Sequence, residues 1–404
     1  MPDSNALQPL TTPVPVSAPM ADVDLYADEV LLDPYAVYSE LREAGPIVYL
    51  PRHRAYALPR YAEVRRALED HETFISGKGV GLYEPGNATR RGTPIASDPP
   101  LHSRVRGIVG ERLSLRSVRQ VQPEIEAKAA ALVDAVLQRG SFDAVSDFAR
   151  VFPLMVMADL IGLPEDGRDK ILGWADAGFN MFGPGNARTL SAMERFPEVA
   201  AYIRSLEAPG RLRPGSMGAA IYEAAERGEL SPSQCGPLMV SYLMAGLDTT
   251  INAISAALLL FGRHPDQWAR VCANPKLLPT AFNEVIRLES PIQTLRRVAA
   301  RDVQIEGVTI PEGASVLMMY GSANRDERQW REPTTFDVAR NPVGHMAFGV
   351  GIHGCPGQIL ARLETVSLLA CLARKGAVLE VGEPVWHINN VVRGLESLSV
   401  RIRT

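Results

Sequence analysis

Apolar residues recur at helical spacing along most of the chain. Residues 124–140 carry this pattern and close on Gly140, which predicts a helix that ends there. Residues 264–291 hold two shorter patterns of the same kind, separated by Pro275. Residues 358–376 hold another, which runs to Gly376. The repeated period of three and four residues therefore predicts a mainly helical protein.

The segment from Gly236 to Gly262 is apolar on almost every side, and Asp248 is its one charged residue. Its length would allow it to cross a bilayer. A carboxylate and several hydroxyls in its middle would be costly in lipid, however. Ser231 followed by Pro232 predicts where the helix begins. We therefore expect a long helix through the middle of a large protein, and no membrane span.

Strand-like patterns are fewer and lie towards the two ends of the chain, at residues 46–60, 301–319, 376–381 and 398–402. They predict a minor sheet beside a helical body, so the expected fold is mainly α with a minor β region. Residues 1–20 lack a basic or strongly apolar stretch and are rich in Pro, Ser and Thr, which predicts a disordered tail. We expect residues 21–404 to form a single domain.

Composition narrows the class of protein. The 404 residues are 46% hydrophobic and carry a net charge of -4, so nothing indicates a nucleic-acid partner. The four cysteines lie far apart and form no CxxC pair. This spacing argues against a disulfide framework or a zinc site and is typical of a protein of the reducing cytoplasm.

One cysteine, Cys355, lies in the glycine-rich stretch AFGVGIHGCPG, directly before a predicted helix. Three interpretations compete: a buried structural cysteine, a nucleophile with His353 as its base, and a thiolate ligand to a metal or haem. The glycines would let the backbone approach a flat surface closely. Free N–H groups at the helix start would lower the pKa of the thiol, and Pro356 suits the first turn.

The pattern Phe348-Gly349-x-Gly351-x-His353-x-Cys355-x-Gly357 resembles the haem-binding loop of the cytochromes P450 at every defining position. The resemblance implies the P450 fold, a triangular prism of helices around a buried haem b. It implies a monooxygenase with the Cys355 thiolate as axial iron ligand, which pushes electron density onto the iron. Phe348 and Gly357 would then contact the haem.

The stretch Ala245-Gly246-Leu247-Asp248-Thr249-Thr250 resembles the oxygen-activation segment of the same family. The resemblance implies that Asp248 and Thr249 relay protons to dioxygen at the haem face. Ala245 and Gly246 would line that face, where Gly246 leaves room for the ligand. The alternative for Thr249 is a hydrogen bond from its hydroxyl to a carbonyl of its own helix.

Two further motifs resemble the P450 pattern. Glu284 and Arg287 match the ExxR pair, and Arg340 ends a matching PxxFxxxR segment, which implies a structural network under the cysteine loop. The segment DPPLHSRVR places His102 and Arg106 four residues apart. The resemblance implies that these two side chains, Arg297 and His353 hold the haem propionates, with Arg296 as the competitor of Arg297.

Several stretches are similar to soluble bacterial P450s that O-demethylate or hydroxylate para-substituted benzoic acids, namely residues 79–82, 179–186, 245–250, 289–294, 321–326 and 393–398. The resemblance implies an apolar slot for an aromatic ring and polar groups for its carboxylate. The expected substrate contacts are Arg90 or Arg91, Thr93, Ile95, Phe179, Phe182, Ser241, Met244, Ile292 and Leu295.

Two of these positions depart from that pattern. Met244 stands where a small hydroxylated residue is expected, and Leu295 stands where an aromatic one is expected. A neutral methoxyphenol or alkylphenol is therefore the alternative substrate.

Five arginines between residues 104 and 119 predict a basic surface near the cysteine, suited to an acidic ferredoxin. No flavin or nicotinamide fingerprint occurs, so we expect a separate NAD(P)H-dependent ferredoxin reductase, with O2 as co-substrate. We expect a cytoplasmic monomer that binds no nucleic acid and no membrane. Two rival classes are a non-oxygenating thiolate-haem protein and a hydrolase with a cysteine nucleophile.

Overall fold

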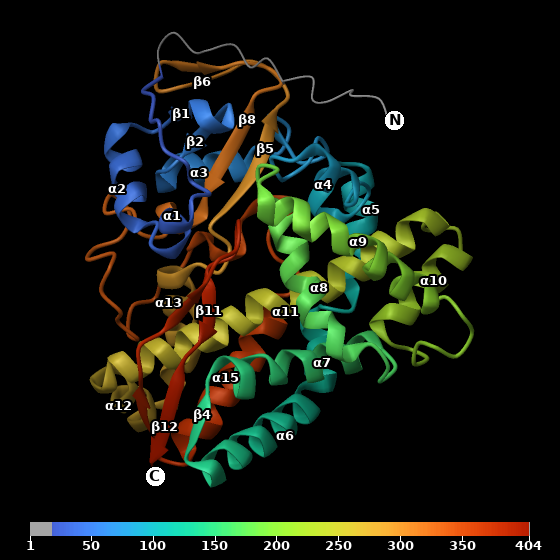
Figure 1. The fold of residues 1–404 in the computed structure, drawn as a ribbon, viewed down its shortest axis with the longest axis vertical. Coiled ribbons are helices and arrows are strands. Elements are labelled where there is room, and N and C mark those ends of the chain that lie inside the picture. The colour runs from blue at the N-terminus through green and yellow to red at the C-terminus, as the bar shows by residue number, and fades with distance from the viewer. Residues whose placement is uncertain (1–17, 404) are drawn as a thin grey trace.

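A computed structural model describes residues 18–403 of the chain and shows a mainly helical protein with small sheets. The long helix α11 (Pro232–Arg263) runs through the middle, and most other helices pack around it (Figure 1). Helices of the chain before α11 are α1 (Asp28–Leu32), α2 (Tyr35–Ala44), α3 (Tyr61–Glu69), α4 (Glu84–Ala88), α5 (Leu101–Glu111), α6 (Leu115–Arg139), α7 (Val151–Ile161), α8 (Arg168–Asn180), α9 (Ala187–Ser205) and α10 (Met217–Glu226). Those after it are α12 (Pro265–Ala273), α13 (Leu278–Glu289), α14 (Tyr320–Ala323) and α15 (Gln358–Arg374).

The start of α11 follows from its sequence. The Ser231 side chain accepts a hydrogen bond from the helix backbone, and the Gln234 side chain accepts one from the backbone N–H of Ser231 at 2.9 Å. Within residues 18–403, α11 is the one helix long and apolar enough to cross a membrane, and 78% of its most apolar stretch is buried inside the protein. The predicted core helix is therefore confirmed.

The other helix predictions hold, with one shifted boundary. Gly140 ends α6 in the left-handed conformation with φ of 69°, as the closing glycine predicts. The helix begins at Leu115 and not at Glu124, however, and Pro123 lies inside it. The helices α12 and α13 lie on either side of Pro275, and α15 ends close to Gly376.

The largest sheet has five strands in the order β1-β2-β8-β5-β3. It packs beside the helical body on the side of the N-terminal helices (Figure 1). Its strands are β1 (Val48–Leu50), β2 (Ala55–Leu58), β3 (Phe74–Ile75), β5 (Thr294–Ala299) and β8 (Ser315–Met319), with β2 and β8 parallel and the other pairs antiparallel. Smaller sheets contain β4 (Ser141–Asp143), β12 (Ser399–Arg403) and β9 (Val378–Val381), then β10 (Val385–His387) with β11 (Gly394–Ser397), and β6 (Val303–Ile305) with β7 (Val308–Ile310).

The sequence patterns predict most of these strands but miss β3, β4, β10 and β11, and also β5, which is almost wholly buried. Its two central residues are Arg296 and Arg297. Because both are charged, the sequence of this buried strand looks like that of an exposed polar segment. The pattern of strands only at the two ends of the chain is also incomplete, because β4 lies mid-chain and pairs with β12.

The predicted tail needs one correction. Residues 1–17 lie outside the described residues. Pro19 and Ala21, however, form backbone hydrogen bonds with Tyr49 of β1 at 2.8 and 3.0 Å, so the ordered chain begins before residue 20.

A buried ion network supports the loop that carries Cys355. Arg287 donates two hydrogen bonds to the carboxylate of Glu284, at 2.7 and 2.8 Å, and Arg340 donates a third at 2.9 Å. Arg287 also donates to the carbonyls of Asn324 and Pro333 at 2.7 and 2.8 Å. The predicted structural network is therefore present, and it ties α13 to the segment before the cysteine loop.

Candidate active site

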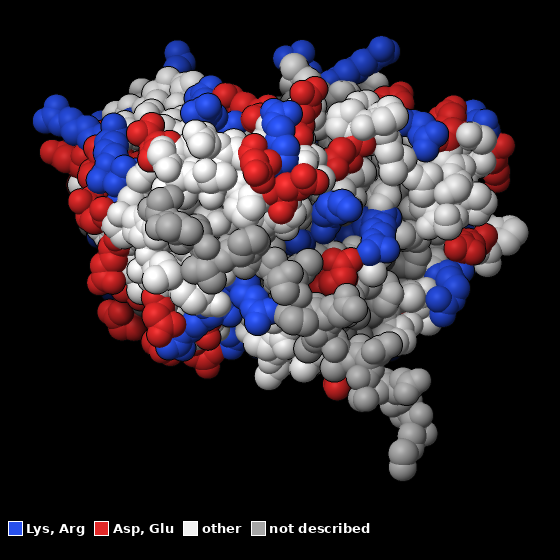
Figure 2. Space-filling model, turned by 90° about the horizontal axis from the view of Figure 1, so that it is seen from above, with Lys and Arg blue, Asp and Glu red and all other residues white. Residues whose placement is uncertain are grey.

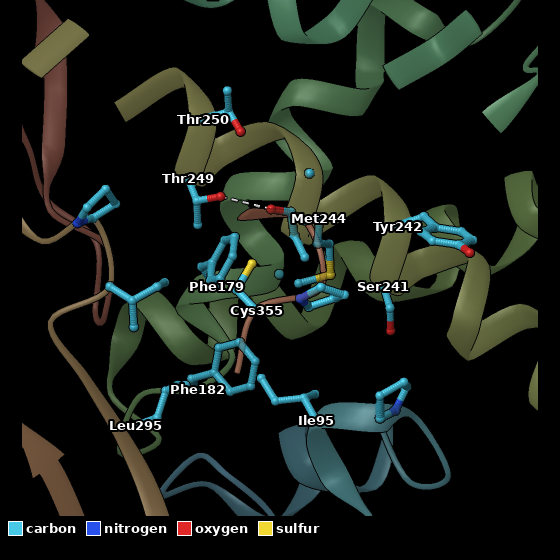
Figure 3. Close-up of a pocket in the computed structure, with 18 of the residues that line it drawn as sticks. Ile95, Phe179, Phe182, Ser241, Tyr242, Met244, Thr249, Thr250, Leu295 and Cys355 are labelled. Carbon is cyan, nitrogen blue, oxygen red and sulfur yellow. Dashed lines mark hydrogen bonds between the residues drawn. The ribbon is translucent and has the colours of Figure 1, made fainter. Parts of the chain in front are cut away.

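A cavity of about 310 Å³ lies between α11 and the Cys355 loop, with α8, α9 and β5 closing its sides. Figure 3 shows the Cys355 sulfur at the back of this space, below Thr249, with Phe182, Ile95 and Leu295 on the other side. The cavity brings together most of the predicted site residues: Arg90, Ile95, Arg106, Phe179, Phe182, Ser241, Met244, Ala245, Gly246, Thr249, Ile292, Leu295, Arg297, Phe348, His353, Cys355 and Gly357.

Four predicted site residues do not line this cavity. Arg91 is exposed and pairs with Glu84 at 2.6 Å. Thr93 is buried, and its hydroxyl donates to the carbonyl of Arg90 at 2.7 Å. His102 packs against the lining residue His353, and Asp248 directly precedes the lining residue Thr249. A direct substrate contact from Arg91 or Thr93 is therefore not what the structure shows.

The cysteine loop folds as its glycines predict. Gly349 and Gly351 have φ of 63° and 71°, and a Cβ on Gly351 would lie 2.6 Å from the carbonyl oxygen of Leu68. The N–H of Cys355 donates to the carbonyl of Phe348 at 2.8 Å, which closes the loop. Pro356 precedes the N-cap Gly357, and α15 begins at Gln358, so Pro356 lies just outside the first turn in which the sequence predicts it.

Burial raises the pKa of the Cys355 thiol, although the N–H groups of Gly357 and Gln358 and the charge of Arg106 lower it. The predicted lowering of the pKa by N–H groups at the helix start is therefore present, but burial outweighs it. The free energy lost when a thiolate is desolvated exceeds the stabilisation that two backbone N–H groups provide. The thiolate therefore needs a bound cation. Of the four cysteines, all within the described residues, Cys355 is the one that lines the cavity.

His353 does not have the properties of a general base for Cys355. Burial and the charge of Arg297 lower the pKa of His353 to about 3. Its ring packs edge-on against His102 at 4.5 Å between centroids. Its Nε2 has no hydrogen-bond partner among the described residues, and neither does Nε2 of His102.

This pair of imidazoles gives a test of whether a haem fits. Buried polar atoms in native structures nearly always have partners, so two orphaned ring nitrogens require an explanation. Arg106 and Arg297 lie at the same end of the cavity, and no ion pair within residues 18–403 involves either. The guanidinium groups of these two arginines and the two imidazole nitrogens have no carboxylate partner among the described residues. A pair of carboxylates, such as the propionates of a haem, would supply that partner. The residues present therefore fit the group.

Alternation along β5 separates its two arginines. Arg297 lines the cavity, whereas Arg296 points away and donates to Ser315 Oγ at 2.8 Å and to the carbonyls of Lys78 and Gly81 at 3.1 and 3.2 Å. The donors of Arg296 are therefore already used, and Arg297 is the arginine that faces the site.

On α11, the hydroxyl of Thr249 donates to the carbonyl of Ala245 at 2.8 Å (Figure 3). The hydrogen bond within the helix is therefore real, and it leaves the hydroxyl oxygen free to accept from the cavity. Burial and the charge of Asp176 raise the pKa of Asp248 to about 7. A carboxyl that titrates near neutral pH can both hold and release a proton under ordinary conditions.

Gly246 serves packing as well as access. A Cβ at this position would lie 2.6 Å from Cε of Met157 on α7. The Met157 side chain fills the space beside Gly246 on the α7 side. The absence of a side chain at Gly246 therefore does not enlarge the cavity on that side.

Arg90 is a buried cation on an apolar wall. Its guanidinium lies 4.1 Å from the ring centroid of Phe182 and donates to the carbonyls of Gly86 and Gly178. Sδ of Met244 lies 3.9 Å from Nη2. Among the described residues no carboxylate pairs with Arg90, and burial lowers its pKa only to about 10, so it stays charged.

Sequence reasoning missed parts of the lining. Phe196 and Val199 of α9 contribute to it, and α9 reads as an ordinary amphipathic helix. Glu364 of α15 also lines the cavity, and burial raises the pKa of this carboxyl well above its ordinary value. An acidic residue within an apolar stretch of α15 was the one available signal.

Comparison with known proteins places this site in a family. A sequence model described as Cytochrome P450 matches residues 219–378. Cytochrome p450 CYP199A2 of Rhodopseudomonas palustris is 42% identical, over 98% of this chain and 98% of that protein. The 6-deoxyerythronolide B hydroxylase of Saccharopolyspora erythraea is 34% identical, over 94% of this chain and 98% of that protein.

Solved structures agree with the sequences. Cytochrome P450 CYP268A2 of Mycobacterium marinum, in complex with pseudoionone, has a TM-score of 0.87 at 28% identity, over 96% of this chain and all of that one. Cytochrome P450 CREJ, in complex with (4-ethylphenyl) dihydrogen phosphate, has a TM-score of 0.83 at 28% identity, over 92% and 98%. The two sequence relatives exceed 30% identity along nearly the whole chain. The chain therefore belongs to the cytochrome P450 family, as a monooxygenase that carries haem b with an axial cysteine thiolate.

Proposed function

We propose that this monooxygenase oxidises a small aromatic substrate with O2 and two electrons from a ferredoxin. The favoured reaction is O-demethylation or hydroxylation of a para-substituted benzoic acid. The observation that carries the proposal is the guanidinium of Arg90, which is buried on the cavity wall and has no carboxylate partner among the described residues. A buried charge without a counter-ion is costly, and a substrate carboxylate would supply the missing anion.

Cys355 is the proposed axial ligand. His102, Arg106, Arg297 and His353 are the proposed partners of the two propionates, on the strength of their unpaired donors. Ala245, Gly246, Phe348 and Gly357 would lie against the flat faces of the group. When bound, haem supplies dioxygen binding and its reductive activation.

Asp248 and Thr249 are the proposed proton path. The Thr249 oxygen faces the cavity and can accept a hydrogen bond from water, since its own proton is given to Ala245. Asp248, one residue earlier and behind the wall, holds a proton near neutral pH. The two together would pass protons from the protein interior to the cavity without opening it to bulk solvent.

The apolar part of the cavity suits a flat ring. Phe179 and Phe182 are tilted by 46° at 6.0 Å between centroids, and Ile95, Ile292 and Leu295 lie nearby on the cavity wall. Ser241 lines the cavity, but its hydroxyl donates to the carbonyl of Pro237 at 2.9 Å, so it can only accept. The carboxylate would therefore bind to Arg90 more than to Ser241.

A neutral methoxyphenol or alkylphenol is the second candidate, and Met244 favours it. The thioether lies against the guanidinium of Arg90, whose other donors already bind two carbonyls. Leu295 in place of an aromatic side chain also leaves the slot less tightly defined. The two candidates differ in one measurable property, the need for a carboxylate.

The proposal of a ferredoxin partner is supported by the surface of α5 and α6. Arg104, Arg116 and Arg119 are exposed there, and no ion pair within residues 18–403 involves them. Elsewhere the charges are mixed: Figure 2 shows acidic and basic side chains side by side over most of the upper face. An acidic partner would therefore associate faster with the α5–α6 face. A cytoplasmic monomer, folded as one domain over residues 21–404, completes the proposal.

The test is a binding and product screen with matched pairs of substrates. We expect 4-methoxybenzoate to shift the haem spin state at a concentration about tenfold lower than 4-methoxyphenol. Turnover should release formaldehyde and 4-hydroxybenzoate in equal amounts. Tighter binding of the phenol, with no turnover of the acid, would replace the first candidate with the second.

A further inference from the structure

Behind Asp248, an imidazole lies between two carboxylates that come from different elements. His387, the last residue of β10, has its Nε2 2.7 Å from Oδ1 of Asp176 on α8. Its Nδ1 lies 3.0 Å from Oε2 of Glu396 on β11. None of the three side chains lines the cavity. The metal-binding and substrate roles described above make no use of them.

The arrangement is held firmly and still reaches solvent. The Asn389 amide donates to Oδ1 of Asp176 at 2.9 Å, and Arg150 donates to Glu396 at 3.3 Å. His387 pairs with Gly394 in the β10–β11 hairpin, which fixes the height of the imidazole relative to Glu396. The side chains of His387 and Asp176 are 31% and 35% exposed, so water has access to both.

The charged groups near Asp248 come from elements that pack on α11. Helix α8 brings Asp176, and the β10–β11 hairpin brings His387 with Glu396. Arg150, next to α7, completes the set of charges near this carboxyl. Asp248, which directly precedes Thr249 of the cavity wall, therefore lies within electrostatic reach of a solvated acid–imidazole group.

The protonation states are linked. Burial and the charge of Asp176 raise the pKa of Asp248 to about 7, while His387 and Arg150 lower it. The hydrogen bond with Asp176 raises the pKa of His387, and the charges of Asp176, Glu396 and Asp248 add to this rise. Burial raises the pKa of Asp176, but hydrogen bonds from His387 and Asn389 outweigh it, and the net shift is downward. The imidazolium form of His387 is thus favoured beside a carboxyl whose pKa is raised to about 7.

We propose that the His387–Asp176 pair is the solvent-side proton store for Asp248, and that His387 is a positioning residue which sets the proton occupancy of that carboxyl. The proposal rests on the role of Asp248 in the proposed function. When Asp248 releases its proton towards the cavity, a carboxylate remains. The imidazolium returns one proton through intervening water and becomes neutral imidazole, and solvent then reprotonates His387. One proton moves inward in each round, and no other bond changes.

The experiment compares His387→Gln and Asp176→Asn with His53→Gln in the haem-loaded enzyme. His53 is a matched control, because it too lies beside a carboxylate, with Nε2 3.3 Å from Oδ1 of Asp24, and far from α11 in the sequence. For His387→Gln we expect an approximately tenfold lower rate of product formation and an unchanged KM. The solvent hydrogen isotope effect should rise, and the alkaline limb of the pH–rate profile should move to higher pH because Asp248 loses a cation that lowers its pKa.

A second readout does not depend on turnover. The titration of His387, followed by NMR in the diamagnetic ferrous carbonyl form, should move to lower pH in Asp248→Asn, since one nearby negative charge is lost. A rate, isotope effect and pH profile that match those of His53→Gln would overturn the proposal, as would a His387 titration unaffected by Asp248→Asn. The proposed function fails separately if Asp248→Asn itself leaves turnover unchanged.

Discussion

The Cys355 side and the Arg90 side of the cavity are built in different ways. Around Cys355 the backbone forms the wall, and glycines at positive φ and a buried ion network fix its path. Around Arg90 the wall consists of side chains from separate elements, held by a few hydrogen bonds to carbonyls. A backbone wall tolerates little change because its residues have no freedom to adjust, whereas a side-chain wall can vary with the substrate. Under the proposed function, the Cys355 side would therefore fix the chemistry of this enzyme, and the Arg90 side would set its specificity.

The largest expected effect comes from removing the cysteine sulfur. Cys355→Ser should abolish turnover and remove the long-wavelength absorption band of the ferrous carbonyl form, because a hydroxyl cannot replace a thiolate as ligand. Cys272→Ser is the matched control, since Cys272 lies outside the cavity. A retained band in Cys355→Ser would show that the sulfur does not bind iron.

Removing one partner of the buried network should be the largest effect on stability. Arg287→Met leaves the Glu284 carboxylate buried without its main partner and should lower the free energy of unfolding by about 3–5 kcal/mol. The control Arg270→Met breaks the exposed pair with Asp337 and should cost about 0–1 kcal/mol. Denaturant unfolding of the haem-loaded enzyme measures both. Equal losses of unfolding free energy in the two variants would show that the buried network contributes no more to stability than an exposed ion pair.

The proton path should show a loss of coupling without a loss of binding. Thr249→Ala should retain haem and substrate affinity but release several times more hydrogen peroxide per electron consumed, because the hydroxyl oxygen that holds water is gone. Thr280→Ala, in which the lost hydroxyl bonds carbonyls outside the cavity, is the control. The account of Thr249 fails if the ratio of product to electrons stays at the wild-type value.

The smallest predicted effect concerns Met244, which lies on the variable side. Met244→Ser removes the thioether next to the Arg90 guanidinium and frees one of its donors. The affinity for 4-methoxybenzoate should rise about three- to tenfold, which corresponds to the net gain of one typical hydrogen bond, about 1 kcal/mol. The affinity for 4-methoxyphenol should stay within twofold. Weaker binding of the acid would mean that Met244 supports the pocket and does not obstruct it.

The sequence predicts the two sides unequally well, for a physical reason. The Cys355 loop, the ExxR network and α11 are set by local constraints, such as turns, caps and i,i+3 pairs, which leave a readable trace. The strand β5 was not predicted, because tertiary contacts bury its two arginines. Arg90 is buried and Arg91 is exposed because of packing against α8. No local sequence pattern predicts this difference.

The net pKa of Cys355 shows the same limit. A helix start is visible in sequence, but the burial that outweighs it is a property of the whole fold. His387 is a further case, since β10, β11, α8 and α11 meet only in three dimensions.

The most direct test of the central claim is ligand binding to Arg90→Gln and Arg91→Gln, each titrated with 4-methoxybenzoate and 4-methoxyphenol. Arg90 is buried on the cavity wall, whereas its neighbour is exposed and paired with Glu84. The account predicts that Arg90→Gln raises the Kd of the acid by about 10- to 100-fold, corresponding to about 1.5–3 kcal/mol, with little change for the phenol. Arg91→Gln should leave both unchanged. Equal weakening of the two ligands by Arg90→Gln, or the same effect from Arg91→Gln, would contradict acid recognition by Arg90.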